Sequence, residues 1–259
     1  MAENFYCGID VGTSFTKAVI VNKKQEIVSK YIERTGSDLE KSINKIITTL
    51  SSPIDISKKD IVQITATGFG RRNVPYANNV ITEISSHAKG AFHFFPQKIT
   101  IIDIGGQDTK IIKLDDKGKI IGFKMNRKCA AGTGSFLEEI SFKLNIPLNK
   151  IDKLASKSIK DTALNSFCTV FASTEIFTRI KEGEKVEDLL KSAFESVIKR
   201  VIELDVFEGD IVCTGGVVKY NTIIKKILAK NIGKKVHTPP DPQINGAFGA
   251  ALYAQETKI

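Results

Sequence analysis

Two segments of the sequence combine residue types that bind phosphate and magnesium. Asp10 and Lys17 are the first and last residues of DVGTSFTK, and Asp103 and Lys110 occupy the same places in DIGGQDTK. Each segment has a glycine two residues after its aspartate, and glycine lets backbone N–H groups approach phosphate oxygens closely. An aspartate at a strand end can hold the water molecules around a Mg²⁺ ion. We therefore expect Asp10 and Asp103 to orient Mg²⁺-bound water and the two lysines to neutralise phosphate charge.

The other polar and glycine residues of the two segments complete the predicted sites. Backbone N–H groups, hydroxyls and one carboxylate are available from Gly12, Thr13, Ser14, Thr16, Gly105, Gly106, Asp108 and Thr109. A tight hairpin whose aspartate only caps its own turn would contain similar residues. Two turns with a matching aspartate favour a binding site over a plain hairpin.

A third glycine turn follows a late apolar run. Gly215, Gly216 and Val217 come after residues 211–214 and precede a predicted helix. Bare backbone at this place can accept the adenine and ribose of a nucleotide beside a helix N-terminus. The pattern is weak by itself, and the sequence contains neither GxxxxGK[ST] nor GxGxxG.

The three turns need a framework of strands and helices. Alternating apolar runs and amphipathic segments predict an α/β protein. The predicted strands are 5–10, 17–21, 27–32, 61–67, 98–104, 109–114, 120–125 and 210–214. The predicted helices are 39–50, 84–94, 134–144, 171–182, 186–204 and 244–255.

The strand–turn–strand–strand–helix pattern occurs twice, about 93 residues apart. This internal repeat predicts two similar lobes with a nucleotide cleft between the paired turns. The predicted boundary lies near Phe95-Pro96, so 1–95 forms the N-terminal lobe. The C-terminal lobe is 96–244, with the second phosphate turn and the third glycine turn. A final helix at about 245–259, rich in glycine and alanine, is expected to pack back on the first lobe.

Composition narrows the class of protein. The 259 residues are 42% hydrophobic and 26% charged, which is typical of a globular protein. The net charge of +9 comes from scattered Lys and Arg pairs without interleaved aromatics, which favours a solvated surface, or an acidic partner protein, over nucleic acid. No apolar stretch approaches the ~18 residues of a membrane span, and the N-terminus lacks a signal-peptide pattern. We expect a cytoplasmic protein without membrane contact.

Two of the four cysteines differ from the others in their surroundings. Cys7 and Cys213 lie within apolar, strand-like runs, as small core residues do. Cys129 and Cys168 lie in polar segments that each lead into a predicted helix, where N–H groups and the helix dipole favour an anionic group. One chain with two such cysteines offers only half of the four thiolates that an iron–sulfur cluster needs.

The turns resemble the two phosphate motifs and the adenosine motif of the ATPase superfamily that includes acetate and sugar kinases, heat-shock chaperones and actin. Within it, the chain closely resembles the activators of 2-hydroxyacyl-CoA dehydratases and benzoyl-CoA reductases. The resemblance extends over nearly the whole chain, in TATGFGRR, TEISSHAKGA, DIGGQDTK, NRKCAAGTGSFLE, FCTVFASTE and PDPQINGAFGAAL. It implies an actin-like ATPase fold of two duplicated ribonuclease-H-like lobes around a nucleotide cleft.

The resemblance also implies a function and its cofactors. Members of this family are homodimers with one 4Fe–4S cluster between the subunits, so the implied ligands are Cys129 and Cys168 of each chain. The implied activity is ATP hydrolysis with Mg²⁺, coupled to the transfer of an electron from ferredoxin or flavodoxin to a dehydratase in an anaerobic cytoplasm. Gln107, in the second turn, would position the attacking water.

Two alternatives stay open. A small-molecule kinase of the same fold would need a carboxylate base, which Glu83 or Asp108 could supply. A nucleotide-dependent scaffold protein would need an assembly surface, which a sequence rarely reveals. His87, one helical turn after Glu83, is expected to be a structural or positioning residue.

Overall fold

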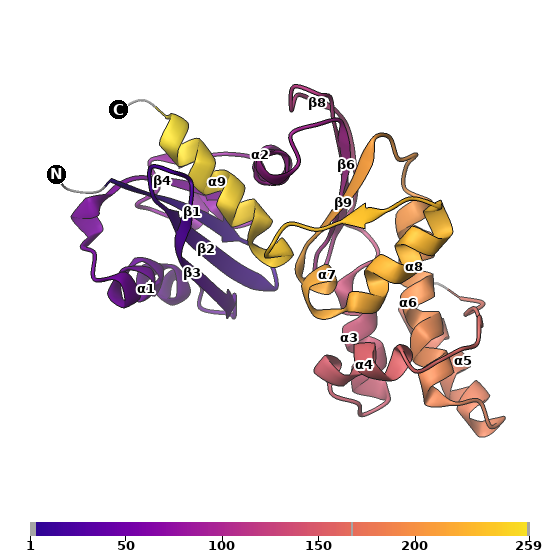
Figure 1. Ribbon diagram of the computed structural model, residues 1–259. Coiled ribbons are helices and arrows are strands. Elements are labelled where there is room, and N and C mark those ends of the chain that lie inside the picture. Colours follow the sequence, from indigo (N-terminus) through magenta and orange to yellow (C-terminus); the bar gives the residue numbers. More distant parts are fainter. Residues whose placement is uncertain (1–3, 167, 258–259) are drawn as a thin grey trace. The chain divides into compact units, whose positions relative to one another are not determined.

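The computed structural model describes residues 4–166 and 168–257, and its contacts divide them into two compact units (Figure 1). Unit 1 contains the described residues up to Gln97, the segment Leu114–Ile120 and the C-terminal segment from Ile244. Unit 2 contains Lys98–Lys113 and Ile121–Gln243. Phe167, the first residue of the FCTVFASTE motif, lies outside the described residues.

Unit 1 is built on a five-stranded sheet with the order β3-β2-β1-β4-β5. Antiparallel pairing joins β1 to β2 and β2 to β3, whereas β1–β4 and β4–β5 are parallel. Asp10, near the end of β1, pairs with Lys17 on one side and with Thr67 on the other. The bounds are β1 (Phe5–Val11), β2 (Phe15–Val21), β3 (Ile27–Arg34), β4 (Ile61–Thr67) and β5 (Asn79–Val80).

Three helices cover this sheet. The amphipathic helix α1 (Leu39–Ser51) buries Ile43 and Ile46 in the same core cluster as Cys7 of β1. The helices α2 (Glu83–Phe94) and α9 (Asn245–Glu256) pack on each other, and α9 also packs on β1 (Figure 1). A Cβ atom at Gly8 would lie 2.0 Å from the Ala247 carbonyl oxygen, so β1 and α9 can approach this closely only because residue 8 is glycine.

Unit 2 has a five-stranded sheet with the order β8-β7-β6-β9-β10. In this sheet β6 takes the place of β1, and β7 and β9 lie on either side of it as β2 and β4 do in unit 1. The central strands β6 and β9 are parallel, and their register sets Asp103 opposite Thr214. The bounds are β6 (Ile99–Ile104), β7 (Thr109–Leu114), β8 (Ile120–Asn126), β9 (Asp210–Thr214) and β10 (Val236–His237). The order is the one that unit 1 has, which confirms the predicted duplication.

The helices of unit 2 bury a core that includes Phe136 and Phe194 against Ile102, Ile104 and Cys213 of the sheet. They are α3 (Gly134–Lys143), α4 (Leu148–Ala155), α5 (Thr169–Lys181), α6 (Val186–Ile202), α7 (Gly216–Tyr220) and α8 (Thr222–Ile232). The predicted helices omit α4 and α8, and α5 begins two residues earlier than predicted. No helix within the described part of the chain is long and apolar enough to span a membrane.

Candidate phosphate turns and cysteine site

The first turn joins β1 to β2 and centres on an ion pair. Lys17 Nζ lies 3.0 Å from Asp10 Oδ2, and the two side chains are 18% and 8% exposed. The turn is closed by a hydrogen bond from Gly12 N to the Phe15 carbonyl oxygen, 3.1 Å. Thr13, at its tip, is exposed, so the turn presents backbone and hydroxyl groups outward and a neutralised carboxylate beneath them.

A threonine from the loop after β3 holds the first turn from behind. Thr35 Oγ1 donates to the Gly12 carbonyl oxygen at 2.7 Å and lies 3.1 Å from Thr16 Oγ1. Thr35 N donates to the Ser14 carbonyl oxygen at 3.1 Å. The hydroxyl of Thr16, which the sequence predicts at the phosphate, is therefore buried in the support of the turn.

Two further segments of unit 1 approach Asp10 closely. A Cβ atom at Gly68, where φ is +91°, would lie 2.5 Å from Asp10 Oδ1. At Gly246, in α9, a Cβ atom would lie 3.1 Å from Asp10 Oδ2 and 2.9 Å from His87 Nε2. The histidine is buried, and Asn245 Nδ2 donates to its carbonyl oxygen at 3.0 Å. His87 therefore lies close to Asp10, where it packs against α9.

The second turn joins β6 to β7 and has one more carboxylate. Lys110 Nζ lies 3.4 Å from Asp103 Oδ2 and 2.8 Å from Asp108 Oδ2. The Thr214 hydroxyl donates to Asp103 Oδ1 at 2.8 Å. Lys110 and Asp103 are each 4% exposed, whereas Asp108 is 23% exposed and Gln107 is exposed. Two carboxylates share one buried cation here, and the turn closes through Gly105 N and the Asp108 carbonyl oxygen, 2.9 Å.

Hydrogen bonds connect the second turn directly to the segment that follows Cys129. Gly134 N donates to the Gly105 carbonyl oxygen at 2.9 Å, and Ser135 N and Oγ both donate to the Gly106 carbonyl oxygen at 2.7 Å. The Thr109 hydroxyl, predicted to face phosphate, donates to the Gly132 carbonyl oxygen at 2.6 Å. The start of α3 is thereby fixed on the turn.

The third turn follows β9. Gly215 has φ of +100°, and a Cβ atom there would lie 2.3 Å from the Ile104 carbonyl oxygen, so only glycine fits. Gly216 begins α7, and Val217 is buried in the core of unit 2. Thr214-Gly215 after β9 matches Thr67-Gly68 after β4, where the threonine again pairs with the aspartate of the neighbouring strand. This repeated Thr-Gly pair is a sequence signal that the motif search missed.

The four cysteines separate into two buried and two exposed thiols, all of them free. Burial raises the pKa of Cys7 and of Cys213 to about 12, so both remain neutral core residues. Cys129 lies in the loop between β8 and α3, and Cys168 is the N-cap residue of α5. The helices α3 and α5 pack on each other. Within the described residues, no group of three or more His, Cys, Asp and Glu side chains is placed to hold a metal ion.

The model of the BadF/BadG/BcrA/BcrD ATPase family matches residues 7–254. The chain belongs to this family. This match confirms the resemblance found in the motifs, and the chain is a member of an ATPase family.

Named relatives of similar length agree with this assignment. The chain is 40% identical over 255 residues to a protein of Anaerotignum propionicum named activator of lactoyl-CoA dehydratase, with 96% of each chain covered. A crystal structure of component A of the (R)-2-hydroxyglutaryl-CoA dehydratase of Acidaminococcus fermentans matches with a TM-score of 0.92 at 36% identity, covering 98% of both chains. The activator of the 2-hydroxyisocaproyl-CoA dehydratase of Clostridium difficile, solved with bound ADPNP, matches with a TM-score of 0.90 at 34% identity, covering 97% of this chain and 94% of that one.

The fold is shared more widely than the family. A ROK family glucokinase of Streptomyces griseus matches with a TM-score of 0.60 at 13% identity, covering 98% of this chain and 100% of that one. A likeness at this identity shows the fold alone. The predicted actin-like ATPase fold with two duplicated lobes is confirmed.

Proposed function

We propose that this chain is an ATP-hydrolysing iron–sulfur protein that activates a 2-hydroxyacyl-CoA dehydratase, or a related acyl-CoA reductase, by delivering a low-potential electron. One observation supports this function over that of a kinase. The second phosphate turn is hydrogen-bonded to the residues that follow an exposed cysteine, through Gly134 and Ser135. A phosphate-binding turn joined to a thiol loop suits an ATPase that controls a redox centre.

In this proposal the two turns bind the phosphates of ATP and its Mg²⁺ ion. Asp10 and Asp103 accept hydrogen bonds from Mg²⁺-bound water, and each forms an ion pair with the lysine of its own turn, Lys17 or Lys110. Backbone N–H groups of both turns and the exposed Thr13 donate to phosphate oxygens. Gln107 is the exposed side chain of the second turn, and we propose that it orients the attacking water. The Gly215 turn accepts the adenosine.

The residues present also fit a cluster shared by two chains. A 4Fe–4S cluster needs four thiolates, and each chain has two exposed thiols, Cys129 and Cys168. We therefore propose a homodimer with one cluster. Cys168 is the N-cap residue of α5, where backbone N–H groups and the helix dipole favour an anionic cluster. When bound, the cluster would accept one electron from ferredoxin or flavodoxin and release it to the dehydratase.

The proposed coupling uses this chain's own hydrogen bonds. Hydrolysis changes the charge that the second turn must hold, and the Gly105 and Gly106 carbonyl oxygens pass any shift of the turn to the start of α3. Cys129 lies in the loop that leads into α3, and Cys168 is the N-cap residue of the neighbouring helix α5. Movement of α3 therefore changes the surroundings of the thiols. A cluster held by exposed cysteines would be lost in air, so we propose that the chain works in an anaerobic cytoplasm.

The experiment mixes anaerobically purified chain, reduced ferredoxin or flavodoxin, and ATP with a panel of dehydratases acting on lactoyl-, 2-hydroxyglutaryl- and 2-hydroxyisocaproyl-CoA. We expect dehydration that depends on ATP and on the chain in at least one mixture. Cys129→Ser is the matched control, because it removes one exposed thiol and leaves both phosphate turns intact. ADP formation that requires an added small acceptor and phosphorylates it, in iron-free protein, would instead identify a kinase.

A further inference from the structure

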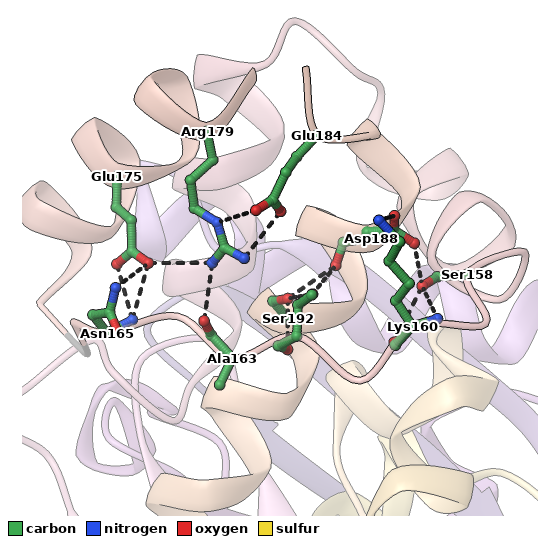
Figure 2. Close-up of polar contacts among 10 residues, drawn as sticks. Ser158, Lys160, Ala163, Asn165, Glu175, Arg179, Glu184, Asp188 and Ser192 are labelled. Carbon is green, nitrogen blue, oxygen red and sulfur yellow. Dashed lines mark hydrogen bonds and ion pairs between the residues drawn. The ribbon is translucent and has the colours of Figure 1, made fainter. Parts of the chain in front are cut away.

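Residues 156–168, between α4 and α5, lead to Cys168 without forming a helix or strand in their described part. Side chains of α5 and α6 nevertheless hold this segment at several points (Figure 2). A thiol that must meet a cluster at a fixed place needs a fixed approach, because ligand geometry around a metal is set by the groups behind the ligands. The position of Cys168 therefore depends on the residues that hold this segment.

The first half of the segment is attached to α6. Ser158 Oγ donates to Asp188 Oδ1 at 2.6 Å, and Asp188 is 4% exposed. Ser192 Oγ, fully buried, donates to the Thr162 carbonyl oxygen at 2.7 Å. These contacts end six residues before Cys168, so they cannot by themselves set its position.

The second half is attached to α5 by one carboxylate. Glu175 accepts hydrogen bonds from Asn165 N at 2.9 and 3.0 Å, from Asn165 Nδ2 at 3.1 Å, and from Ser166 N at 3.3 Å. Figure 2 shows both oxygens of the carboxylate directed at Asn165. Hydrogen bonds from N–H groups to a charged acceptor are stronger than those between neutral groups.

A neighbouring arginine holds the same carboxylate in place. Arg179 Nη1 lies 3.3 Å from Glu175 Oε1 and donates to the Ala163 carbonyl oxygen at 2.9 Å. The rest of its guanidinium forms two contacts with Glu184, at 3.0 and 2.9 Å. Hydrogen bonding to Glu184 raises the pKa of Arg179, and the guanidinium remains charged. Glu175 and Arg179 are 15% and 16% exposed, so water weakens these contacts only in part.

The attachment reaches Cys168 in one further step. Cys168 N donates to Ser166 Oγ at 3.2 Å, and the Cys168 carbonyl oxygen accepts from Ala172 N at 2.8 Å as α5 begins. Glu175 lies two helical turns farther along α5 and binds the backbone of residues 165 and 166. The backbone of Cys168 is therefore held by α5 in two ways, directly at the N-cap and through the Glu175 carboxylate.

We propose that Glu175 is a positioning residue for Cys168, which holds the approach to this cysteine against α5 so that its thiol is presented at the helix N-terminus. The purpose given to the thiol rests on the proposed function, in which Cys168 is a cluster ligand. The bonds made by Glu175 do not depend on that function. The two can therefore be tested separately on the same protein.

The experiment compares the wild type with Glu175→Gln and with Glu182→Gln. The first change keeps the size of the side chain but turns one acceptor into an N–H donor that faces other N–H donors. Glu182 is an exposed residue at the C-terminal end of the same helix, which makes it a matched control. In iron-free protein we measure hydrogen exchange over residues 160–168 and the alkylation rates of Cys168 and Cys129.

In Glu175→Gln, we expect exchange at Asn165 and Ser166 to accelerate at least about tenfold, because hydrogen bonds to a charged acceptor are lost. Cys168 should be alkylated faster relative to Cys129, which serves as the internal reference. In cluster-loaded protein, a chelator should remove iron faster. Glu182→Gln should match the wild type. Glu175→Asp keeps the charge on a shorter side chain, so its exchange and alkylation rates should lie between those of the wild type and Glu175→Gln. It replaces Glu175→Gln in the comparison if that variant does not fold.

Unchanged exchange, or an unchanged ratio of the two alkylation rates, would overturn the proposal. So would faster exchange with unchanged iron release in loaded protein. A wild type that holds no iron after anaerobic reconstitution would refute the cluster. The exchange and alkylation results, which need no iron, would still decide whether Glu175 positions Cys168.

Discussion

The two phosphate turns share an aspartate, a glycine, a threonine and a lysine in the same register but differ in how deeply their ion pairs are buried. In the first turn, Lys17 pairs with Asp10 and is 18% exposed. In the second, Lys110 lies between Asp103 and Asp108 and is 4% exposed. The repeated pattern thus preserved the aspartate and lysine, while the second turn gained a second carboxylate.

The two turns also differ in what their carbonyl oxygens bind. The Gly12 carbonyl oxygen accepts from Thr35, in the loop after β3 of its own unit. The Gly106 carbonyl oxygen accepts from Ser135, at the start of the helix that follows Cys129. Carbonyl oxygens of turn glycines therefore support the turn itself in unit 1 and connect the turn to a thiol loop in unit 2. This difference supports our proposal that nucleotide state would reach the cysteines through the second turn.

The largest expected difference concerns the two lysines. Lys110→Met leaves two carboxylates close together without their buried cation, and we expect a loss of about 3–5 kcal/mol in the free energy of unfolding. Lys17→Met removes a partly exposed pair and should cost about 1 kcal/mol. Urea unfolding of both variants measures the difference. Equal losses would show that the two turns are electrostatically alike.

The two aspartates are expected to affect ATP hydrolysis by similar factors. Asp10→Asn and Asp103→Asn should each lower the rate about 10- to 100-fold and raise the Mg²⁺ concentration needed, as loss of a group that orients metal-bound water does. Hydrolysis measured over a range of Mg²⁺ concentrations tests this. A variant with normal hydrolysis would remove its turn from the ATP site.

A matched pair of hydroxyl variants separates support of a turn from coupling. Thr35→Val and Ser135→Ala each remove a 2.7 Å hydrogen bond to a turn glycine, and each should cost about 1 kcal/mol of stability. Only Ser135→Ala should alter the ATP-dependent change in Cys129 alkylation. If Thr35→Val alters it equally, the connection through α3 is not the route.

The smallest expected effect distinguishes the buried thiols of the two sheets. Because burial raises the pKa of Cys7 and Cys213 to about 12, iron-free native protein at pH 8 should react with alkylating reagents at Cys129 and Cys168 alone.

The same buried thiols should make stability depend on pH. Above pH 9 the unfolded chain loses thiol protons that the folded chain keeps, so the free energy of unfolding should fall as pH rises. In Lys110→Met, Cys213 should become reactive before Cys7. If Cys7 reacted first, Lys110→Met would have destabilised unit 1 more than unit 2.

Much of the sheet framework could be predicted from the sequence. The strands β4, β7 and β9 have the predicted bounds, because each is a run of apolar and β-branched residues that a turn residue ends. The prediction missed α4, which buries only Ile151 and Ala155 and reads as a polar stretch. It also missed α8, whose apolar pairs lie between lysines.

The site was predictable only in its aspartates, lysines and glycines. The supporting hydroxyls of Thr35, Ser135 and Thr214 come from distant parts of the sequence. The carboxylate of Glu175 lies only 10 positions from Asn165, but Ser, Thr and Glu are common on any surface. Only the repeated Thr-Gly pair after β4 and β9 left a signal for Thr214. The rest depends on strand order and helix packing, which bring the Ser135 hydroxyl to the carbonyl oxygen of a glycine 29 positions earlier.

The central claim is that nucleotide at the phosphate turns controls a cluster held by Cys129 and Cys168. The most direct measurement is the rate at which a chelator removes iron from anaerobically purified protein, with ADP and with a non-hydrolysable ATP analogue. We predict about four iron atoms per two chains and faster removal with the ATP analogue. Protein without iron, or removal at the same rate with both nucleotides, would contradict the account.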